Sequence, residues 1–314
     1  MALSAVERRL VDTSAAIMGD AVDDPAFLHV IMAQVGLPYR DPKNDFYERS
    51  TGRASIALTA GRLRDPHSRQ WVKPGLPYGA RPRLLMLHLC TYAVQHQSPV
   101  VPIKDSMTAF MRDMNITATG GQLGSIARFK DQMNRLSAAQ MQFSMDYGRN
   151  RAVQFNPAPM IRKADLWFPQ DARQLTLWAS EVRLSNEFFD ELKKNALPVD
   201  PRAFHMLQHS ARALDLYTWL AHRLRRVKER GGAFISWQAL QQQFGSDTTQ
   251  LQNFRRQCTV ALNQALYAYK DAKVFYVPGG IRLFKSSPPI PEKTSVRGSR
   301  VGPKVIEGKA EELP

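Results

Sequence analysis

Apolar side chains recur every three or four positions in two separate stretches of the chain, residues 122–138 and residues 249–262. This spacing is typical of an amphipathic helix with one buried face. The residues predicted to form the buried faces are Leu123, Ile126, Phe129, Met133 and Leu136 in the first stretch, and Leu251, Phe254, Cys258 and Leu262 in the second. The other faces carry mostly Gln, Asn, Arg and Lys, so we expect them to meet solvent or a binding partner.

Each of these helices is preceded and followed by the same kinds of element. In the first copy the pattern predicts a helix at 82–97, a strand at 100–103, a helix at 107–114 capped by Ser106, a turn at 119–121 and, after the amphipathic helix, a hairpin at 141–145 and 152–155. In the second copy it predicts one long helix at 201–230, a strand at Ile235, a helix at 237–244 capped by Ser236, a turn at 245–247 and a hairpin at 273–277 and 281–285.

Helix, strand, helix, turn, helix and hairpin in this order are typical of a winged helix-turn-helix domain. The sequence therefore predicts an α+β, mainly helical protein with two tandem winged helix-turn-helix domains and a disordered C-terminal tail. The predicted boundaries are a helical and strand-containing extension at 1–75, winged-helix domains at 76–165 and 166–285, and the tail at 286–314. Outside the two copies, the pattern predicts helices at 1–20, 25–35 and 186–195 and strands at 53–58 and 175–184.

The charge distribution adds a functional expectation. The chain has 43 Lys and Arg against 28 Asp and Glu, a net charge of +15. The excess lies in residues 76–160, with nine basic against four acidic residues, and in residues 201–285, with thirteen against four. Each block contains one amphipathic helix. Basic charge concentrated in folded segments indicates a polyanionic partner such as DNA.

The second copy has the side chains best suited to reading base edges. At 100° per residue, its polar face is centred on Thr249, Gln252, Asn253 and Arg256. Arg pairs with guanine, and Asn or Gln with adenine, in the major groove. We predict that Thr249, Asn253 and Arg256 read bases with support from Gln252, and that Arg255 contacts phosphate.

The first copy has fewer such donors. Aligning its Phe129 with Phe254 puts Arg128 in the place of Asn253 and Asp131 in the place of Arg256. We therefore expect weaker DNA binding here, or a surface shared with a protein partner. The residues predicted to contact DNA are Gln122, Ser125, Arg128, Lys130 and Arg135 in this copy, Arg149 and Arg151 at its hairpin tip, and Arg282 and Lys285 at the second hairpin.

Catalytic and metal-binding patterns are weak or absent. His222 and Arg225 satisfy the H-x-x-R pattern of tyrosine recombinases, but His209 and Arg212 do so equally, and both pairs lie in an apolar helical pattern. There is no His-x-His pair, no phosphate-binding G-x-x-x-x-G-K-[ST] motif and no Cys/His cluster. We expect no catalytic residues, no cofactor, no metal, no membrane span and, from two unpaired cysteines, a cytoplasmic location.

Several segments resemble plasmid-encoded RepA-type replication initiators. They are GLPYGARPRLLMLHLCTYAVQHQSP at 75–99, SMTAFMRDM at 106–114, TGGQLGSIARFKDQMNRL at 119–136 and DFYERSTGRASIALTAG at 45–61. The likeness extends over roughly residues 25–285 and is more specific in the first copy than in the second. It implies two winged-helix domains that bind directly repeated sites, called iterons, at a plasmid origin. It also implies exchange between a repressing homodimer and an origin-binding monomer, and recruitment of the host replicative helicase.

The sequence thus predicts a sequence-specific double-stranded DNA-binding protein that initiates plasmid replication and represses its own promoter. A winged-helix transcriptional repressor with no role in replication is the alternative, and a tyrosine recombinase is a more distant one. The amino-acid sequence separates the first two poorly because both bind DNA with the same kind of domain.

Overall fold

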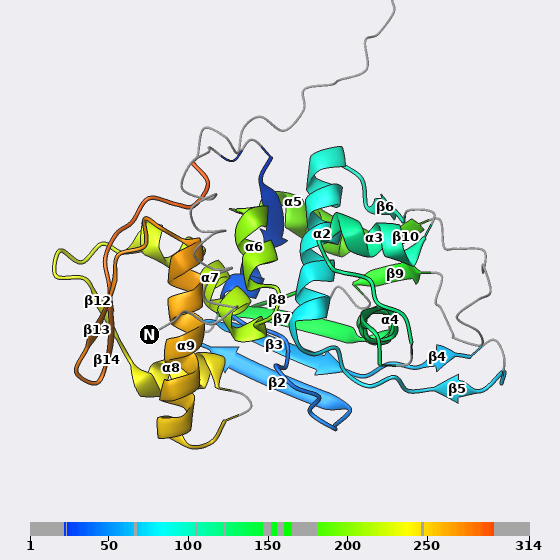
Figure 1. The fold of residues 1–314 in the computed structure, drawn as a ribbon, viewed down its shortest axis with the longest axis horizontal. Helices are drawn as coiled ribbons and strands as arrows, with labels where there is room; N and C mark the ends of the chain where they lie inside the picture. The colour runs from blue at the N-terminus through cyan, green and yellow to red at the C-terminus, as the bar shows by residue number, and fades with distance from the viewer. Residues whose placement is uncertain are drawn as a thin grey trace, which may run out of the picture.

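The computed structural model describes residues 22–291 except 23, 66–67, 104–105, 122, 147–151, 156–159, 165–180 and 246–247. The predicted mixture of helices and strands is confirmed (Figure 1). In this part of the chain the helices are α2 (Ala80–His96), α3 (Met107–Asp113), α4 (Ser125–Ala138), α5 (Asn186–Lys194), α6 (Pro201–Leu207), α7 (Ala211–Arg223), α8 (Trp237–Phe244) and α9 (Leu251–Ala268), with 3-10 turns η1 (Val30–Ala33) and η2 (Leu224–Arg226).

Within the described residues, short antiparallel strands form five small sheets, of orders β1-β11, β6-β10-β9, β12-β14-β13, β2-β3-β7-β8 and β4-β5. Their bounds are β1 (Ala26–His29), β2 (Phe46–Thr51), β3 (Ala54–Thr59), β4 (Leu63–Arg64), β5 (Trp71–Val72), β6 (Val100–Pro102), β7 (Gln140–Asp146), β8 (Ala152–Phe155), β9 (Ile161–Ala164), β10 (Glu181–Leu184), β11 (Ala196–Val199), β12 (Ala233–Ser236), β13 (Val274–Val277) and β14 (Gly280–Leu283).

The four-stranded sheet joins the N-terminal segment to the first predicted hairpin. β3 pairs with β7, so that Ile56 lies opposite Phe143 and Leu58 opposite Met141, all buried. Buried and less buried residues alternate along β3, so the buried side chains share one face of the sheet. The helices α2, α3 and α4 lie above the sheet in Figure 1. Strands inside the predicted extension thus share a sheet with the first winged-helix range, although the predicted boundaries themselves remain a prediction.

The two copies differ in how their strands pair. In the second copy β12 joins its own hairpin, giving the three-stranded sheet β12-β14-β13. In the first copy β6 pairs with β10 instead, and the hairpin of β7 and β8 is extended by β3 and β2. The order of elements is therefore repeated along the chain, whereas the pairing of strands is not.

The helix predicted at residues 25–35 is wrong. Residues 26–29 form strand β1, which pairs with β11, and only the four residues of η1 are helical. The amide of Phe27 donates to the Thr91 hydroxyl at 2.9 Å, and the His29 side chain accepts from the amide of Ile31. The hydrogen bonds that β1 makes with the distant strand β11 stabilise a strand here, although the local spacing of apolar residues favours a helix.

The single helix predicted at 201–230 is also wrong. α6 ends at Leu207, and the Ser210 side chain caps α7 by accepting from the amide of Ala213 at 3.3 Å. The apolar pattern continues across this break because both helices face the same core, so periodicity alone could not reveal it. η2 ends at Arg226 rather than at residue 230.

Two smaller expectations need correction. Leu123 is 82% exposed and lies before α4 begins, so it is not part of the buried row. Residues 286–291 do not belong to a disordered tail as predicted, because Ser286 and Ile290 are buried and the Tyr269 hydroxyl donates to the Ser287 carbonyl at 2.6 Å. Residues 292–314 and the helix predicted at 1–20 lie outside the described residues.

Serine caps start four of the helices in the described part of the chain. Ser236 begins α8 by accepting from the amide of Ala239 at 3.1 Å. Replacing this residue with alanine removes the acceptor, and we expect the free energy of unfolding to fall by about 1 kcal/mol. Urea unfolding followed by circular dichroism measures the change. Ser287→Ala, at an exposed serine that caps no helix, is the control and should cost less than about 0.5 kcal/mol.

Candidate nucleic-acid interface

Helix α9 buries one row of side chains and exposes the predicted base-reading row. Phe254, Cys258 and Leu262 are fully buried against the core. The residues predicted to read bases or to support them, Thr249, Gln252, Asn253 and Arg256, are all exposed. The thiol of Cys258 is free, and burial raises its pKa to about 12, so it is a packing residue. The outward face is therefore open to a ligand along the first half of the helix.

The turn into α9 is held in place from two sides. On α8, the Gln241 side chain donates to the carbonyls of Thr248 and Thr249, at 3.0 Å each. From β2, the Arg49 guanidinium donates to the carbonyls of Gln241 and Gln243 at 3.1 Å, at the C-terminal end of α8. A cation is favourable there because the last carbonyls of a helix carry partial negative charge. The start of α9 is thereby fixed relative to the rest of the fold.

A buried arginine braces α9 from behind. Arg212 on α7 donates to the Phe244 carbonyl at 3.1 Å and to the Gln257 side chain on α9 at 2.7 Å. Its guanidinium also lies 4.8 Å from the centre of the Tyr39 ring. Gln257 is thus occupied on the inward side of α9.

Two exposed residues of α9 have partners of their own. The Arg255 guanidinium lies 5.5 Å from the centre of the Trp237 ring, a cation–π distance. Asn253 donates to the Gln250 side chain at 2.7 Å. The contact of Arg255 directs it toward the start of α8, on the flank where we predicted a phosphate contact rather than base reading.

The predicted residues of the first copy fall into three groups. Ser125 works in the turn before α4, because its hydroxyl donates to the Thr117 carbonyl at 2.6 Å and accepts from the amide of Thr119. Arg135 is inward and forms ion pairs with Asp131 at 3.0 Å and with Asp41 at 3.4 Å. Arg128 is exposed, Lys130 is half-buried with a pKa lowered by that burial, and Gln122 lies outside the described residues.

One basic residue of this surface was missed by the sequence analysis. Arg81 lies on the first turn of α2, and its buried Nε has no hydrogen-bond partner among the described residues. Burial and then the nearby charge of Arg128 lower the pKa of Arg81. Two arginines held this close favour a shared anion. No spacing rule links residues 81 and 128, because they meet only through the packing of α2 against α4.

The residues predicted to contact DNA from the two hairpins lie either outside the described residues or away from the hairpin tip. Arg149 and Arg151 lie outside the described residues. The tip of the second hairpin is formed by Pro278 and Gly279, whereas Arg282 lies within β14 and donates to the Gly231 carbonyl at 2.9 Å. Lys285 lies beyond the strand and is exposed. Arg282 and Lys285 therefore lie on and after the second strand of the hairpin, away from its tip, and their contact with DNA stays a prediction.

The exposed face of α9 continues beyond the predicted residues. Val260, Asn263 and Tyr267 follow Arg256 at helical spacing and are exposed. Asn263 accepts a hydrogen bond from the Tyr276 hydroxyl on β13 at 2.6 Å, which fixes the hairpin against the helix. The 3.6-residue period could have extended the predicted face this far, but the mixed residue types gave no chemical reason to do so.

Within the residues that the structure describes, no group of three or more His, Cys, Asp and Glu side chains could hold a metal ion. Over the same residues, no helix is long and apolar enough to cross a membrane. Burial and the neighbouring charges of Arg226, Arg225 and Arg223 lower the pKa of His222 to about 4. The imidazole of this residue is therefore neutral at pH 7.

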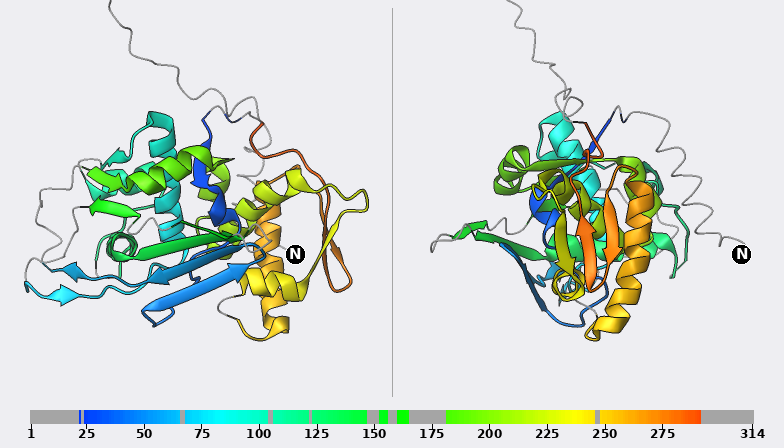
Figure 2. Two further views of the ribbon diagram at one scale, coloured as in Figure 1. Left: turned by 180° about the vertical axis from the view of Figure 1, so that it is seen from behind. Right: turned by 90° about the vertical axis from the view of Figure 1, so that its left-hand side faces the viewer.

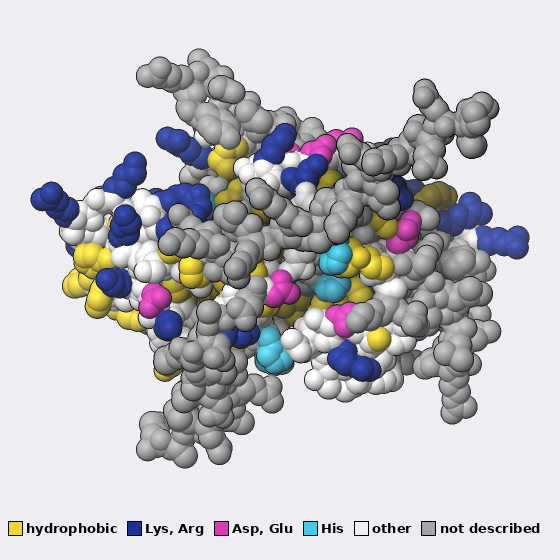
Figure 3. Space-filling view, turned by 90° about the horizontal axis from the view of Figure 1, so that it is seen from above, with side chains coloured by type: hydrophobic (Ala, Val, Ile, Leu, Met, Phe, Trp, Pro, Cys, Tyr) yellow, Lys and Arg dark blue, Asp and Glu magenta, His cyan; other side chains and the backbone are white. Residues whose placement is uncertain are grey.

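A group of basic side chains lies at the end of the molecule that carries the three-stranded sheet. Seen from above, Lys and Arg gather at the end that carries β12, β13 and β14, beside a group of hydrophobic side chains (Figure 3). The basic residues of this end include Arg225, Arg226, Lys270, Lys273 and Lys285. The charge excess of the second block is thus partly separate from the exposed start of α9.

Comparison with known proteins gives one family. A model of the family described as plasmid-encoded RepA protein matches residues 76–239. Two solved structures of domains 2 and 3 of RctB are similar to the chain. One, a selenomethionine derivative, has 15% identity, a TM-score of 0.48, and coverage of 81% of this chain and 93% of that chain. The other has 13% identity, a TM-score of 0.47, and coverage of 80% and 93%. No curated protein matches the chain.

Proposed function

Because the chain belongs to the family of plasmid-encoded RepA proteins, we propose that it initiates plasmid replication by binding double-stranded DNA at directly repeated origin sites. The observation that carries the proposal is the exposed row formed by Thr249, just before α9, and by Gln252, Asn253 and Arg256 on α9. The last three lie in the first two turns of the helix, the part of a recognition helix that approaches base edges most closely. The net charge of +15 supplies the attraction to phosphate.

We assign α9 as the recognition helix of a winged helix-turn-helix domain. The domain is built from α7, β12, α8, α9 and the hairpin of β13 and β14, in the order of elements that such a domain has. Three antiparallel strands, β12-β14-β13, cover one side of the helices. In the first copy, α3 and α4 take the corresponding positions, with a hairpin whose sheet is completed by β3 and β2.

The two copies have different tasks in this proposal. Thr249, Asn253 and Arg256 read bases with support from Gln252, while Arg255 reaches phosphate from the flank. Arg128 and the missed Arg81 hold a phosphate of the backbone, and Arg149 and Arg151 contact phosphate or the minor groove. Arg135 and Ser125 keep α4 and its turn in place instead of touching DNA. The second copy therefore determines sequence preference, and the first adds affinity that depends little on sequence.

Arg256→Ala tests the base-reading role. We expect binding to a duplex with the origin repeats to weaken by about 1–3 kcal/mol, with the loss of preference confined to one base-pair position. Arg128→Ala should weaken binding to all sequences alike and reduce the slope of log K against log salt by about 1. Fluorescence anisotropy with duplexes substituted at each position in turn measures both effects.

Lys194→Ala is the control, because this exposed lysine on α5 pairs with Glu191 and should leave binding unchanged. The division of tasks is wrong if Arg256→Ala and Arg128→Ala alter the base preference and the salt slope in the same way. The recognition-helix assignment is wrong if neither variant weakens duplex binding.

The initiator role requires a separate experiment, because duplex binding alone also fits a repressor. A vector without its own origin, carrying the gene and its flanking DNA, should be maintained autonomously. The same vector should no longer be maintained when the base-reading side chains of Thr249, Asn253 and Arg256 are removed.

Binding at the gene's promoter would account for autorepression, and the same domains would serve both tasks. The proposal needs no catalytic group, cofactor or metal. Exchange between dimer and monomer and recruitment of the host helicase belong to the proposal as well, and both rest on family membership.

A further inference from the structure

The outer face of the sheet β12-β14-β13 carries exposed aromatic residues around an arginine. Phe234, Arg282 and Phe275 lie side by side across the three strands. Phe234 is 48% exposed and Phe275 is 56% exposed. Their neighbours in sequence point to the opposite face, where Ile281 and Leu283 are buried against the helices. Figure 2, in its right-hand view, looks toward this sheet, with α9 to one side.

A second row extends this aromatic surface. Phe284 follows Arg282 by two residues on the same face, and its ring meets that of Phe275 edge-on, with centroids 5.6 Å apart. Gly232 lies beneath it with φ of +78°, and a Cβ there would come within 3.0 Å of the Phe284 ring. The Gly231 carbonyl accepts from the Arg282 guanidinium at 2.9 Å, which fixes the end of this side chain at the loop before β12. We call Phe234, Phe275, Arg282 and Phe284 the aromatic platform.

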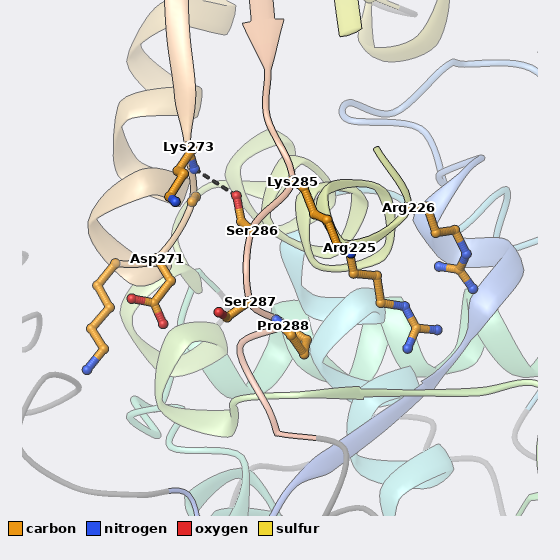
Figure 4. Close-up of a pocket in the computed structure, with 10 residues that line it drawn as sticks. Arg225, Arg226, Asp271, Lys273, Lys285, Ser286, Ser287 and Pro288 are labelled. Carbon is orange, nitrogen blue, oxygen red and sulfur yellow. Dashed lines mark hydrogen bonds between the residues drawn. The ribbon is translucent and has the colours of Figure 1, made fainter. Parts of the chain in front are cut away.

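A basic pocket of about 810 Å³ adjoins the platform (Figure 4). Its charged lining residues are Arg225, Arg226, Lys270, Lys273, Lys285 and Asp271. Five cations against one carboxylate give a strongly positive concave surface, and such a surface raises the local concentration of anions. The pocket lies where η2 and the end of α9 meet the residues after β14.

The platform and the pocket are continuous. The amide of Phe284 donates to the Lys273 carbonyl at 2.9 Å, so the last ring of the platform lies beside a cation that lines the pocket. The amide of Lys273 in turn donates to the Ser286 hydroxyl at 3.0 Å. The backbone that carries both surfaces is therefore fixed by hydrogen bonds, and a ligand can extend from one surface to the other.

We propose that the aromatic platform and the basic pocket together bind single-stranded nucleic acid, with bases stacked on Phe234, Phe275 and Phe284 and phosphates held in the pocket. Aromatic rings on an exposed sheet beside a positive groove are the recurrent means of holding unpaired strands. Paired bases inside a duplex show no face to such rings. The platform also lies on the outer side of the sheet, whereas α9 packs against its inner side through Tyr276 and Asn263. An apolar protein partner would satisfy the rings but would make no use of the net positive charge of the pocket.

The test uses the full chain and a labelled oligothymidine about twenty nucleotides long, an oligouridine of equal length and the origin duplex. We expect the double variant Phe234→Leu, Phe275→Leu to bind oligothymidine at least about fivefold more weakly and the duplex with unchanged affinity. Leucine keeps apolar bulk at both positions but removes the stacking surface. The matched variant Phe234→Tyr, Phe275→Tyr keeps the rings and should bind as the wild type does.

The pocket is tested by Lys273→Gln, which should lower the affinity for oligothymidine and reduce its salt slope by about 0.7, the value for one phosphate on a single strand. If oligouridine binds as tightly as oligothymidine, the site recognises single-stranded nucleic acid of either kind. If oligouridine binds more weakly than oligothymidine, the ligand is DNA.

The inference is overturned if the wild type does not bind either oligonucleotide, if the leucine variant binds as tightly as the tyrosine variant, or if a polyglutamate peptide displaces the strand at equal concentration. Equal loss of oligothymidine and duplex binding in the leucine variant would also overturn it. Because duplex binding at α9 is measured separately, failure of this inference leaves the proposed function standing.

Discussion

Asp215→Ala is expected to lower the free energy of unfolding by about 3–5 kcal/mol, the largest effect that we predict for a single substitution. Asp215 on α7 receives two hydrogen bonds from Arg83 on α2, at 2.7 Å and 2.8 Å, and both residues are buried. Burial alone would lower the pKa of Arg83, but the carboxylate of Asp215 outweighs this and raises it. Removing the carboxylate leaves a buried guanidinium without its counter-charge.

This ion pair joins the two halves of the molecule. Arg83 also donates to the carbonyls of Leu37 and Gly79 at 2.6 Å each. The Tyr39 ring lies between Arg83 and Arg212, with its centre 5.1 Å and 4.8 Å from their guanidinium carbons. Because Arg212 braces α9 through Gln257, the ion pair is connected to the candidate recognition helix by direct contacts.

Urea unfolding of the full chain measures the effect, with Lys193→Ala as the control. Lys193 pairs with Asp190 at 2.8 Å, but both side chains are largely exposed, and such pairs contribute about 0–1 kcal/mol. The double variant Arg83→Met, Asp215→Leu removes both charges together and should be clearly more stable than Asp215→Ala. A loss from Asp215→Ala no larger than that from Lys193→Ala would show that the buried pair contributes little.

The second large effect concerns acid stability and the buried His29. Burial lowers the pKa of His29 from 6.5 to about 4, against a smaller opposing effect of Glu191. Between pH 6.5 and pH 4, His29 is protonated in the unfolded chain but stays neutral in the folded chain. The free energy of unfolding therefore has its full value above pH 6.5 and falls as the pH approaches 4. One unit of pKa difference corresponds to about 1.4 kcal/mol, so His29 accounts for a loss of about 3 kcal/mol across this range.

His29→Asn should flatten the dependence of unfolding free energy on pH between 6.5 and 4. Asparagine can still accept from the amide of Ile31, as the His29 ring does at 3.2 Å, so the start of η1 is preserved. His209→Asn, the same substitution at an exposed position, is the control. Equal slopes for the wild type and His29→Asn would show that the imidazole is not held neutral. His222 adds a slope of its own over the same range, so the variant reduces the pH dependence without abolishing it.

Much of the fold could be predicted from the sequence at positions where the local preference of the chain and the tertiary packing favour the same structure. Ser106 and Ser236 were predicted as helix caps and accept the expected amide hydrogen bonds. Both amphipathic helices and both hairpins form close to the predicted positions. The break between α6 and α7 was missed because the two helices present one continuous apolar pattern to a shared core.

The candidate site was predictable in the second copy and much less so in the first. On α9 the polar residues project outward simply because Phe254 and Cys258 project inward, so helical geometry assigned the face. On α4, the residue type and helical position of Arg135 predict a phosphate contact, but its ion pairs with Asp131 and Asp41 direct the side chain inward. An arginine's partners, and not its type, decide whether its charge reaches solvent.

By itself the sequence determined which segments are helices and hairpins in the two copies, the outward face of α9 and the concentration of positive charge. These follow from short-range spacing, because neighbours along a helix or strand are fixed by backbone geometry. Only the tertiary structure decided that β3 completes the first hairpin's sheet, that Arg83 meets Asp215, that Arg81 lies near Arg128 and that the aromatic platform adjoins a basic pocket. Such pairings join residues far apart in the chain, and they depend on how the whole core packs rather than on any local pattern.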